Sequence, residues 1–397
     1  MRSPSILLAA TLFAFAAPAL AQQGKPVKVA LIADKTGPLE SYAKQTTDGF
    51  MLGLEYATKG TMTVAGRKIE VVQKDSQTKP DVGRNLLAEA FGDDDAELAV
   101  GGTSSAVALA MLPVAQEFQR VLIVEPAVAD SITGDKWNKY IFRTGRNSSQ
   151  DAISNAVAIG KPGTVVATLA QDYAFGRDGV AAFREALKGT GAKLVHEEYA
   201  PQAATDFTAP AQRIFDALAK EQGRKVIWVL WAGAVNPLSK LAQLDPKRLG
   251  IELASGGNIL PAMAAYKELP GMEGATYYYY DIPKNPANEW LVAEHRKRFN
   301  APPDFFTAGG MSAAMAVVAA LTKTNGATDS EKLIAAMEGM EFDTPKGKMI
   351  FRKDDHQALQ SMYHFRIKVD PDVAWGIPEL VRELKIEDMA IPITNKR

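Results

Sequence analysis

The stretch ELAVGGTSSAVALAMLPVAQEFQRVLIVEPA, residues Glu97 to Ala127, decides the fold class. An apolar run that ends in two glycines is followed by an amphipathic segment from Val107 to Phe118 and then by the run VLIVEPA. Such short apolar runs predict buried strands, and the segment between them predicts a helix. A strand, a helix and a second strand in this order form the unit of a parallel sheet.

The turn GGTSS, residues Gly101 to Ser105, places three hydroxyl groups where the first strand meets the helix. Three interpretations are open at this point. Ser104 could be a nucleophile on a strand-to-helix elbow, the turn could cradle an anion at the helix N-terminus, or a serine could simply cap the helix. The two glycines would let the backbone approach a ligand closely.

The same alternation of strand and helix runs along most of the chain. Before the opening stretch it predicts strands at 27–33 and 68–75 and helices at 42–57 and 80–91. After residues 140–145 a second series predicts strands at 164–170, 192–199 and 225–231 and helices at 177–188 and 206–221. This pattern specifies an α/β fold with two doubly wound lobes of mostly parallel sheet. Ligands of such sheets bind beyond the carboxyl ends of the strands, which for two lobes is the cleft between them.

The first residues have the pattern of a secretory signal. Arg2 precedes the apolar run ILLAATLFAFAAPAL, and Ala19-Leu20-Ala21 forms an A-x-A cleavage site. We therefore expect residues 1–21 to be removed after Ala21 and the mature chain to be periplasmic. The sequence contains no cysteine, which excludes a lipid-modified cysteine and any disulfide. The formal net charge of -1 gives no basic field for nucleic acid or an anionic membrane, so a small molecule is the expected ligand.

The sequence contains no complete catalytic, metal-binding or nucleotide-binding motif. Gly102 to Ala106 misses the pattern G-x-S-x-G at its last position, and none of the four histidines lies in a loop typical of a catalytic base. The run Asp93-Asp94-Asp95 lacks the spacing of a calcium loop, and H-E-x-x-H, G-x-G-x-x-G and Walker A patterns do not occur. We therefore expect no catalytic residue, no metal site and no cofactor.

Five motifs in order resemble the type I periplasmic solute-binding proteins of ABC transporters, in particular the leucine/isoleucine/valine-binding branch. They are TGPLESYAKQTTDGFMLGLEYA, GGTSSAVALAMLPVAQE, VLIVEPAVADSITG, YIFRTGRNSSQDA and QDYAFGRDGVAAFREALKGTGAKLV. The resemblance covers nearly all of the chain after the signal sequence. It implies a clamshell that closes on one small molecule and docks on a membrane permease. A monomer is the default expectation for the oligomeric state.

The fold of that family implies split lobes joined by a three-strand hinge. We expect lobe one to comprise residues 25–143 and 281–343, and lobe two to comprise 144–280 and 344–397, including the hairpin KMIFRKDDHQALQSMYHFRI. The run of tyrosines from 277 to 280 is expected to be a strand that crosses between the lobes. The segment from Phe305 to Lys323 is expected to be a buried helix whose first residues face the cleft.

The resemblance also implies a set of ligand contacts. Ser104 or Ser105 would hold the ligand carboxylate, with the backbone of the next loop at Ala127 and Ala129. Aromatic residues of the second lobe would pack on the ligand. The full set of candidate ligand-binding residues is Ser104, Ser105, Ala127, Ala129, Tyr42, Tyr173, Phe175, Trp231, Gly257 and Tyr280.

One departure from the family concerns the ligand's other end. Amino-acid binders of this branch place a glutamate in a second-lobe loop to pair with the ammonium group, and the similar stretch here, LASGGNILPAM from Leu253 to Met263, contains no carboxylate. A desolvated ammonium without a partner is costly. The sequence therefore favours an aromatic or aromatic keto carboxylate, unless Glu125 or Asp172 substitutes. A branched-chain or other amino acid as ligand, and a ligand-sensing role, stay open as alternatives.

Overall fold

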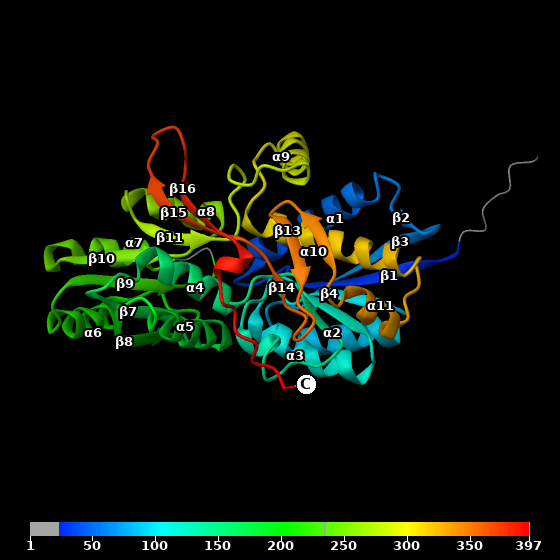
Figure 1. Cartoon of the computed structure of the whole chain (residues 1–397), viewed down its shortest axis with the longest axis horizontal. Helices are drawn as coiled ribbons and strands as arrows, with labels where there is room; N and C mark the ends of the chain where they lie inside the picture. The colour runs from blue at the N-terminus through cyan, green and yellow to red at the C-terminus, as the bar shows by residue number, and fades with distance from the viewer. Residues whose placement is uncertain (1–23, 234–235, 397) are drawn as a thin grey trace, which may run out of the picture.

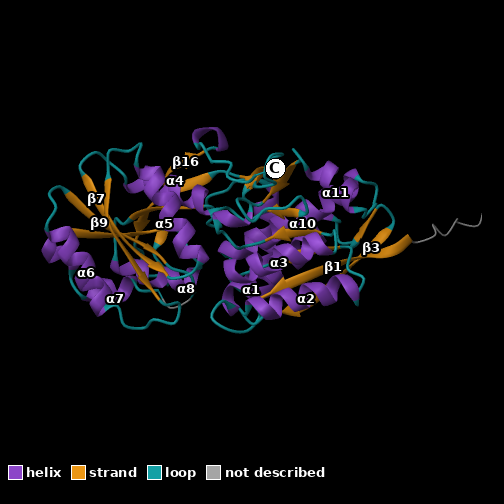
Figure 2. Cartoon of the chain, turned by 90° about the horizontal axis from the view of Figure 1, so that it is seen from below, coloured by secondary structure: helices purple, strands orange, loops and turns teal. Residues whose placement is uncertain are grey.

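The computed structural model describes residues 24–233 and 236–396. The expected signal peptide, residues 1–21, lies outside these residues. Two lobes, each built on its own parallel sheet, lie side by side along the long axis of the molecule (Figure 1; Figure 2). The α/β fold with two lobes of mostly parallel sheet that the sequence predicted is therefore confirmed.

Lobe one is built on a six-stranded sheet in which only the edge pair β2–β3 is antiparallel. In spatial order its strands are β2 (Thr63–Val64), β3 (Arg67–Asp75), β1 (Gly24–Ala33), β4 (Leu98–Gly101), β5 (Val121–Val124) and β6 (Ile141–Arg143). The chain leaves β1 toward β3 and leaves β4 toward β5, so the strand order reverses between β1 and β4. A ligand site is expected at such a switch point, beyond the carboxyl ends of the two strands.

Helices cover both faces of this sheet. They are α1 (Glu40–Ala57), α2 (Pro80–Gly92), α3 (Ser105–Glu117), α10 (Phe305–Lys323) and α11 (Ser330–Met337). A further helix, α9 (Pro286–Phe299), packs on α1, where Trp290 contacts Tyr56. A small antiparallel sheet of β12 (Glu341–Thr344), β13 (Gly347–Phe351) and β14 (Ala358–Leu359) completes the lobe. Its residues Phe342, Met349 and Phe351 belong to the same apolar core as β1, β4 and β5.

Lobe two repeats the plan with four parallel strands. They are β10 (Ile251–Ser255), β9 (Arg224–Leu230), β7 (Thr164–Gln171) and β8 (Lys193–Ala200), and the strand order reverses between β7 and β9. Helices α4 (Ser148–Ile159) and α5 (Ala174–Leu187) cover one face, and α6 (Thr208–Ala219) and α7 (Leu238–Gln243) cover the other. An antiparallel sheet of β11 (Glu273–Thr276), β15 (Met362–Lys368) and β16 (Ile377–Leu384) lies beside them.

Most strands and helices lie within about three residues of their predicted bounds, but the C-terminal part differs. The predicted hairpin from Lys348 to Ile367 is divided between two sheets, because β13 and β14 pair with β12 whereas β15 pairs with β11. Residues 347–359 therefore lie with lobe one and not, as predicted, with lobe two. The tyrosines from 277 to 280 follow β11 as irregular chain and not as a strand.

Within the described residues the chain passes between the lobes four times. Three passages lie between β6 and α4, between β11 and α9, and between β14 and β15, as a three-strand hinge requires. The fourth follows β16, because the tail from Lys385 returns to lobe one, where the carbonyl oxygens of Ile391 and Pro392 accept hydrogen bonds from Arg352 (2.8 and 3.0 Å). Figure 1 shows this red tail running from β16 past α3.

Helices α1 and α10 approach each other through glycines. A Cβ atom on Gly49 would lie 2.0 Å from the Thr307 carbonyl oxygen, and one on Gly310 would lie 2.0 Å from the Thr46 carbonyl oxygen. Helix α10 is long and apolar enough to pass as a membrane span by composition, but 83% of its apolar window is buried inside the molecule. It is the buried helix that the sequence predicted, and its first residues lie at the cleft.

Candidate functional site

A cavity of about 70 Å³ lies between the lobes, where the two switch points face each other. Lobe one contributes the loops after β1, β4 and β5 and the start of α10. Lobe two contributes the start of α4, the loops after β7 and β10, and the end of β9. The cavity therefore lies where the parallel-sheet topology predicts a ligand site.

The GGTSS turn lines this cavity through Thr103 and Ser105, whereas Ser104 lies away from it. Ser104 is the N-cap of α3, because its side chain accepts a hydrogen bond from the Ala106 N–H (3.3 Å) and its own N–H donates to Asp34 Oδ2 (3.0 Å). The Ser105 hydroxyl oxygen accepts from the Ala129 N–H (3.2 Å), which leaves the hydroxyl proton for another acceptor.

The two glycines of this turn serve the backbone of lobe one and not the ligand. Gly101 has a φ of +146°, and a Cβ atom there would lie 2.0 Å from the Ile32 carbonyl oxygen at the end of β1. Gly102 has a φ of +85°, in the left-handed region that favours glycine. Neither glycine lines the cavity, contrary to the expectation that the pair gives a ligand access to the backbone. The space beside Gly101 is filled by β1, and the space beside Gly102 is filled by Ala108 of α3.

Seven of the ten predicted site residues line the cavity: Ser105, Ala127, Tyr42, Tyr173, Phe175, Trp231 and Gly257. Ser104, Ala129 and Tyr280 do not. Ala129 is fully buried, with its N–H donated to Ser105 and its carbonyl oxygen accepting from Arg143 (2.7 Å). Tyr280 lies behind the cleft, where its ring contacts the ring of Tyr279 (4.5 Å between centroids). None of the four histidines, all of which lie in the described part of the chain, lines the cavity.

Sequence reasoning missed Arg146, which lies in the first passage between the lobes and lines the cavity. Its guanidinium stands over the rings of Tyr277 (4.8 Å) and Phe305 (5.0 Å). In the described residues its only hydrogen bond is from Nε to Asp151 Oδ1 (3.0 Å). The terminal amino groups of the guanidinium are therefore available to a ligand oxygen.

Asp151, in the first turn of α4, brings a carboxylate into the cavity that sequence reasoning also missed. Burial raises the pKa of Asp151, and the nearby Arg146 opposes that shift. The two carboxylates considered from the sequence lie elsewhere. Glu125 is 1% exposed and accepts from Thr144 Oγ1 (2.9 Å), and Asp172 pairs with Arg177 outside the cavity (2.7 Å). Arg146 and Asp151 stand five residues apart in the motif YIFRTGRNSSQDA. This pair of opposite charges is the signal from which the sequence could have identified them.

A family model described as periplasmic binding protein matches residues 26–372. The chain belongs to the periplasmic binding protein family. More narrowly, it is an ABC-type solute-binding protein of the branched-chain amino acid transporter family.

Solved structures and curated proteins that resemble this chain are also solute-binding proteins of this kind. An ABC-type branched-chain amino acid transporter protein from Rhodopseudomonas palustris CGA009 is 73% identical, with a TM-score of 0.84, and the match covers 94% of this chain and 100% of that one. A solute-binding protein from R. palustris BisB5 in complex with 3,4-dihydroxybenzoic acid is 28% identical, with a TM-score of 0.80 and coverage of 92% and 99%. A Leu/Ile/Val-binding protein homolog 6 from Brucella melitensis is 25% identical, over 88% of this chain and 89% of that protein.

Hydrogen bonds across the cleft hold this binding protein closed. The Tyr42 hydroxyl of lobe one donates to Asn258 Oδ1 and accepts from the Gly233 N–H of lobe two, both at 2.8 Å. At the rim, Ser131 of lobe one donates to Asp178 of α5 through both its N–H (2.9 Å) and its hydroxyl (2.8 Å). Burial raises the pKa of Tyr42 to about 12, so its hydroxyl keeps its proton at neutral pH.

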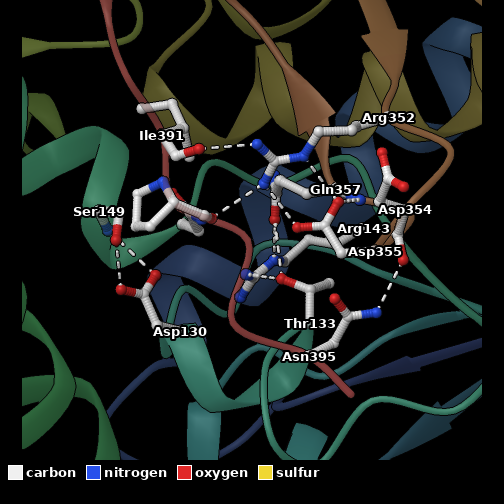
Figure 3. Close-up of polar contacts among 12 residues, drawn as sticks. Asp130, Thr133, Arg143, Ser149, Arg352, Asp354, Asp355, Gln357, Ile391 and Asn395 are labelled. Atoms are coloured by element: carbon white, nitrogen blue, oxygen red, sulfur yellow. Dashed lines mark hydrogen bonds and ion pairs between the residues drawn. The ribbon is translucent and has the colours of Figure 1, made fainter. Parts of the chain in front are cut away.

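The hinge of the binding protein is a polar network (Figure 3). Arg143, at the end of β6, is fully buried and donates to Gln357 Oε1 (2.5 Å) and to Thr133 Oγ1. Arg352 joins Asp355 (2.6 Å) to the C-terminal tail. The first passage and the returning tail are thereby attached to the same part of lobe one.

Proposed function

We propose that this binding protein captures a small aromatic carboxylate between its lobes and delivers it to the permease of an ABC importer. The observation that carries the proposal is Arg146. Arg146 lines the cavity, and its Nε is held by Asp151, so its terminal amino groups are available to bind a carboxylate by charge-assisted hydrogen bonds. The Thr103 and Ser105 hydroxyls on the facing lobe are further donors.

The walls of the cavity fit a planar ring. Aromatic side chains come from both lobes, and those that line it are Tyr42, Tyr173, Phe175, Trp228, Trp231, Phe305 and Phe306. Flat apolar walls with a few placed polar groups are typical of sites for small aromatic ligands. The relative from R. palustris BisB5, which holds 3,4-dihydroxybenzoic acid, supports this class of ligand.

Asp151 favours a second candidate, an α-amino acid. Its side chain is 16% exposed and only Oδ1 is bonded to Arg146, so Oδ2 is placed to accept from an ammonium group. The curated relatives named as Leu/Ile/Val-binding proteins agree with that possibility. The two candidates differ in their need for Asp151, because an aromatic acid has no ammonium group.

The deciding experiment is calorimetric titration of refolded, ligand-free protein with aromatic acids, aromatic keto acids, leucine, isoleucine and valine. The variants are Arg146→Gln, Asp151→Asn and the double variant. The double variant removes both charges, so neither is left buried without its partner. For an aromatic carboxylate we expect the double variant to lose about 30-fold or more in affinity, about 2 kcal/mol, and Asp151→Asn to change it only a few-fold.

Three other results would count against the proposed ligand class or against the role of Arg146. Tighter binding of leucine, with Asp151→Asn abolishing it, would establish the amino-acid alternative. Binding of aromatic acids that is unchanged in the double variant would remove Arg146 from the site. If no carboxylate bound, the proposal would be wrong.

The location of the protein is part of the same proposal. We infer cleavage after Ala21 and a monomeric periplasmic protein, in line with the family of periplasmic binding proteins. Intact mass of the protein recovered from a periplasmic extract should correspond to a chain that begins at Gln22. Stimulation of ATP hydrolysis by the reconstituted transporter would support delivery to a permease, and its absence would favour a ligand-sensing role.

A further inference from the structure

The deep wall of the cavity on lobe two contains a hydrogen-bond donor with no partner. Trp228 lies in β9, lines the cavity and is 1% exposed, with its ring stacked on Phe183 at 4.0 Å. Its indole Nε1 has no hydrogen-bond partner in the part of the chain that the structure describes. A buried tryptophan N–H normally has one, and leaving such a group unpaired costs about 1–3 kcal/mol.

A second unpaired group lies beside it. Thr168 of β7 is the register partner of Trp228 in the parallel pair β7–β9, so both side chains project from the same face of the sheet. Thr168 is fully buried, and its hydroxyl also has no partner among residues 24–233 and 236–396. Two neighbouring unpaired polar groups at one place indicate a place for a polar atom that belongs to neither side chain.

The other polar group near this wall is already bonded. Asn155 lies one helical turn after Asp151 on α4, on the same face of that helix. Its Oδ1 accepts from the Ala275 N–H (3.0 Å), and its Nδ2 donates to the Asp151 carbonyl oxygen (2.8 Å). Asn155 is therefore a fixed part of the wall, and the unmet hydrogen bonds belong to Trp228 and Thr168.

We propose that the Trp228 indole N–H is a specificity-determining donor for an acceptor oxygen on the ligand, at the end away from its carboxylate. This inference rests on the proposed function, in which Arg146 holds the carboxylate. The preferred ligands then carry a ring hydroxyl or carbonyl group, with Thr168 as the second neighbour of that oxygen. A plain hydrocarbon ring would fill the same space and leave the N–H unpaired.

The test compares ring substituents of equal size. Calorimetric titrations use benzoate, the 3- and 4-methylbenzoates and the 3- and 4-hydroxybenzoates, with wild-type protein, Trp228→Phe and the isosteric Thr168→Val. We expect at least one hydroxybenzoate to bind about tenfold tighter than its methyl counterpart, which is about 1.4 kcal/mol. In Trp228→Phe that preference should fall below threefold. The preference is a ratio of affinities within one variant, so any loss of benzoate affinity from the smaller ring cancels. Thr168→Val should reduce the preference only in part.

Three outcomes would overturn the inference, and they differ in what they say of the proposed function. Benzoates that bind wild-type protein with no preference for the hydroxyl, or a preference that survives Trp228→Phe, would leave the proposed function standing and remove this role of Trp228. Binding of none of the five acids would overturn both.

If Trp228→Phe does not fold, a crystal structure of wild-type protein with the best hydroxybenzoate decides. We expect the ring oxygen within hydrogen-bond distance of Nε1, up to about 3.2 Å. A ring oxygen that points away from Trp228 would contradict the inference.

Discussion

At the scale of single residues, Asp304 joins the two lobes through one carboxylate. It caps α10 by accepting from the Phe305 N–H (2.7 Å), and it accepts from Gln45 Nε2 of α1 (2.8 Å). It also accepts from the Leu260 N–H of lobe two (2.9 Å). Burial raises the pKa of Asp304 to about 6, although each of these hydrogen bonds favours the charged form.

This carboxylate predicts a pH-dependent stability. Because its pKa rises from 3.8 in the unfolded chain to about 6 in the folded one, the folded state binds the proton more tightly and loses stability as pH rises between these values. The loss is about 3 kcal/mol. Asp304→Asn keeps an N-cap but does not titrate. We expect its free energy of unfolding in urea to improve relative to wild type by about that amount between pH 4 and pH 7.

Titration of neighbouring groups does not affect the comparison of wild type with Asp304→Asn. Tyr277 and Tyr278 interact with Asp304, but burial raises the pKa of each far above this range. Parallel stability curves for wild type and Asp304→Asn would show that the carboxylate is not perturbed by its surroundings.

Part of the site could be predicted residue by residue. Tyr42, Tyr173, Phe175 and Trp231 follow strands, whose ends can be located from hydrophobic periodicity. The resemblance to solute-binding proteins then singled out these aromatic positions as ligand contacts. Arg146 and Asp151 follow the passage into lobe two and begin a helix, a position that periodicity does not single out. Trp228 was missed because a tryptophan inside a strand has the pattern of a core residue.

At the scale of elements, the contact between α1 and α10 depends on missing side chains. At Gly310 the backbone of α10 lies against that of α1, and the Thr46 carbonyl oxygen occupies the space that a Cβ atom would need. Rigid backbone cannot yield as the end of a side chain can. The contact therefore fixes the position of Phe305 and Phe306 at the cleft.

We expect Gly310→Ala to destabilise the protein by about 2–3 kcal/mol, because forced separation of the helices outweighs the better helix propensity of alanine. Urea unfolding measures the effect. Gly189→Ala is the matched control, since nothing lies within 4 Å of the added methyl group. Equal midpoints for the two variants would contradict tight packing between α1 and α10.

The sequence pattern predicted most elements but not all of their partners. Strand–helix alternation identified most elements from β1 to β9, since burial on both faces leaves a clear apolar run. It missed the two-residue strand β2 and the helix α4. It did not show that β13 and β14 return to lobe one. Strands of five and two residues carry little pattern, and their pairing is decided by contacts with β12 and with the core around Phe342.

At the scale of the whole molecule, Ser131 and Asp178 form a closing contact that lies outside the cavity. Contacts of this kind shift the balance between open and closed forms without touching the ligand. Their two hydrogen bonds are each worth about 1 kcal/mol. Closure by the ligand then adds to a bias that is already present in the free protein.

We expect Asp178→Ala to give ligand-free protein a larger radius of gyration in solution scattering and to lower ligand affinity about tenfold. Saturating ligand should restore the compact form of wild type. Asp216→Ala, on the outer face of α6, serves as the control, because among residues 24–233 and 236–396 this acid bonds only to Gln212. An unchanged radius with unchanged affinity would show that the rim contact does not contribute to closure.

The fourth passage of the chain has a consequence for biosynthesis. The first strand, β1, lies in the middle of its sheet, yet its lobe also needs β12 to β14 and the returning tail. The other lobe needs β15 and β16 beside β11. Until the residues from Met362 onward have been made, a nascent polypeptide therefore lacks β15 and β16 of one lobe and the returning tail of the other. Premature termination near the end of the message leaves neither half of the molecule complete.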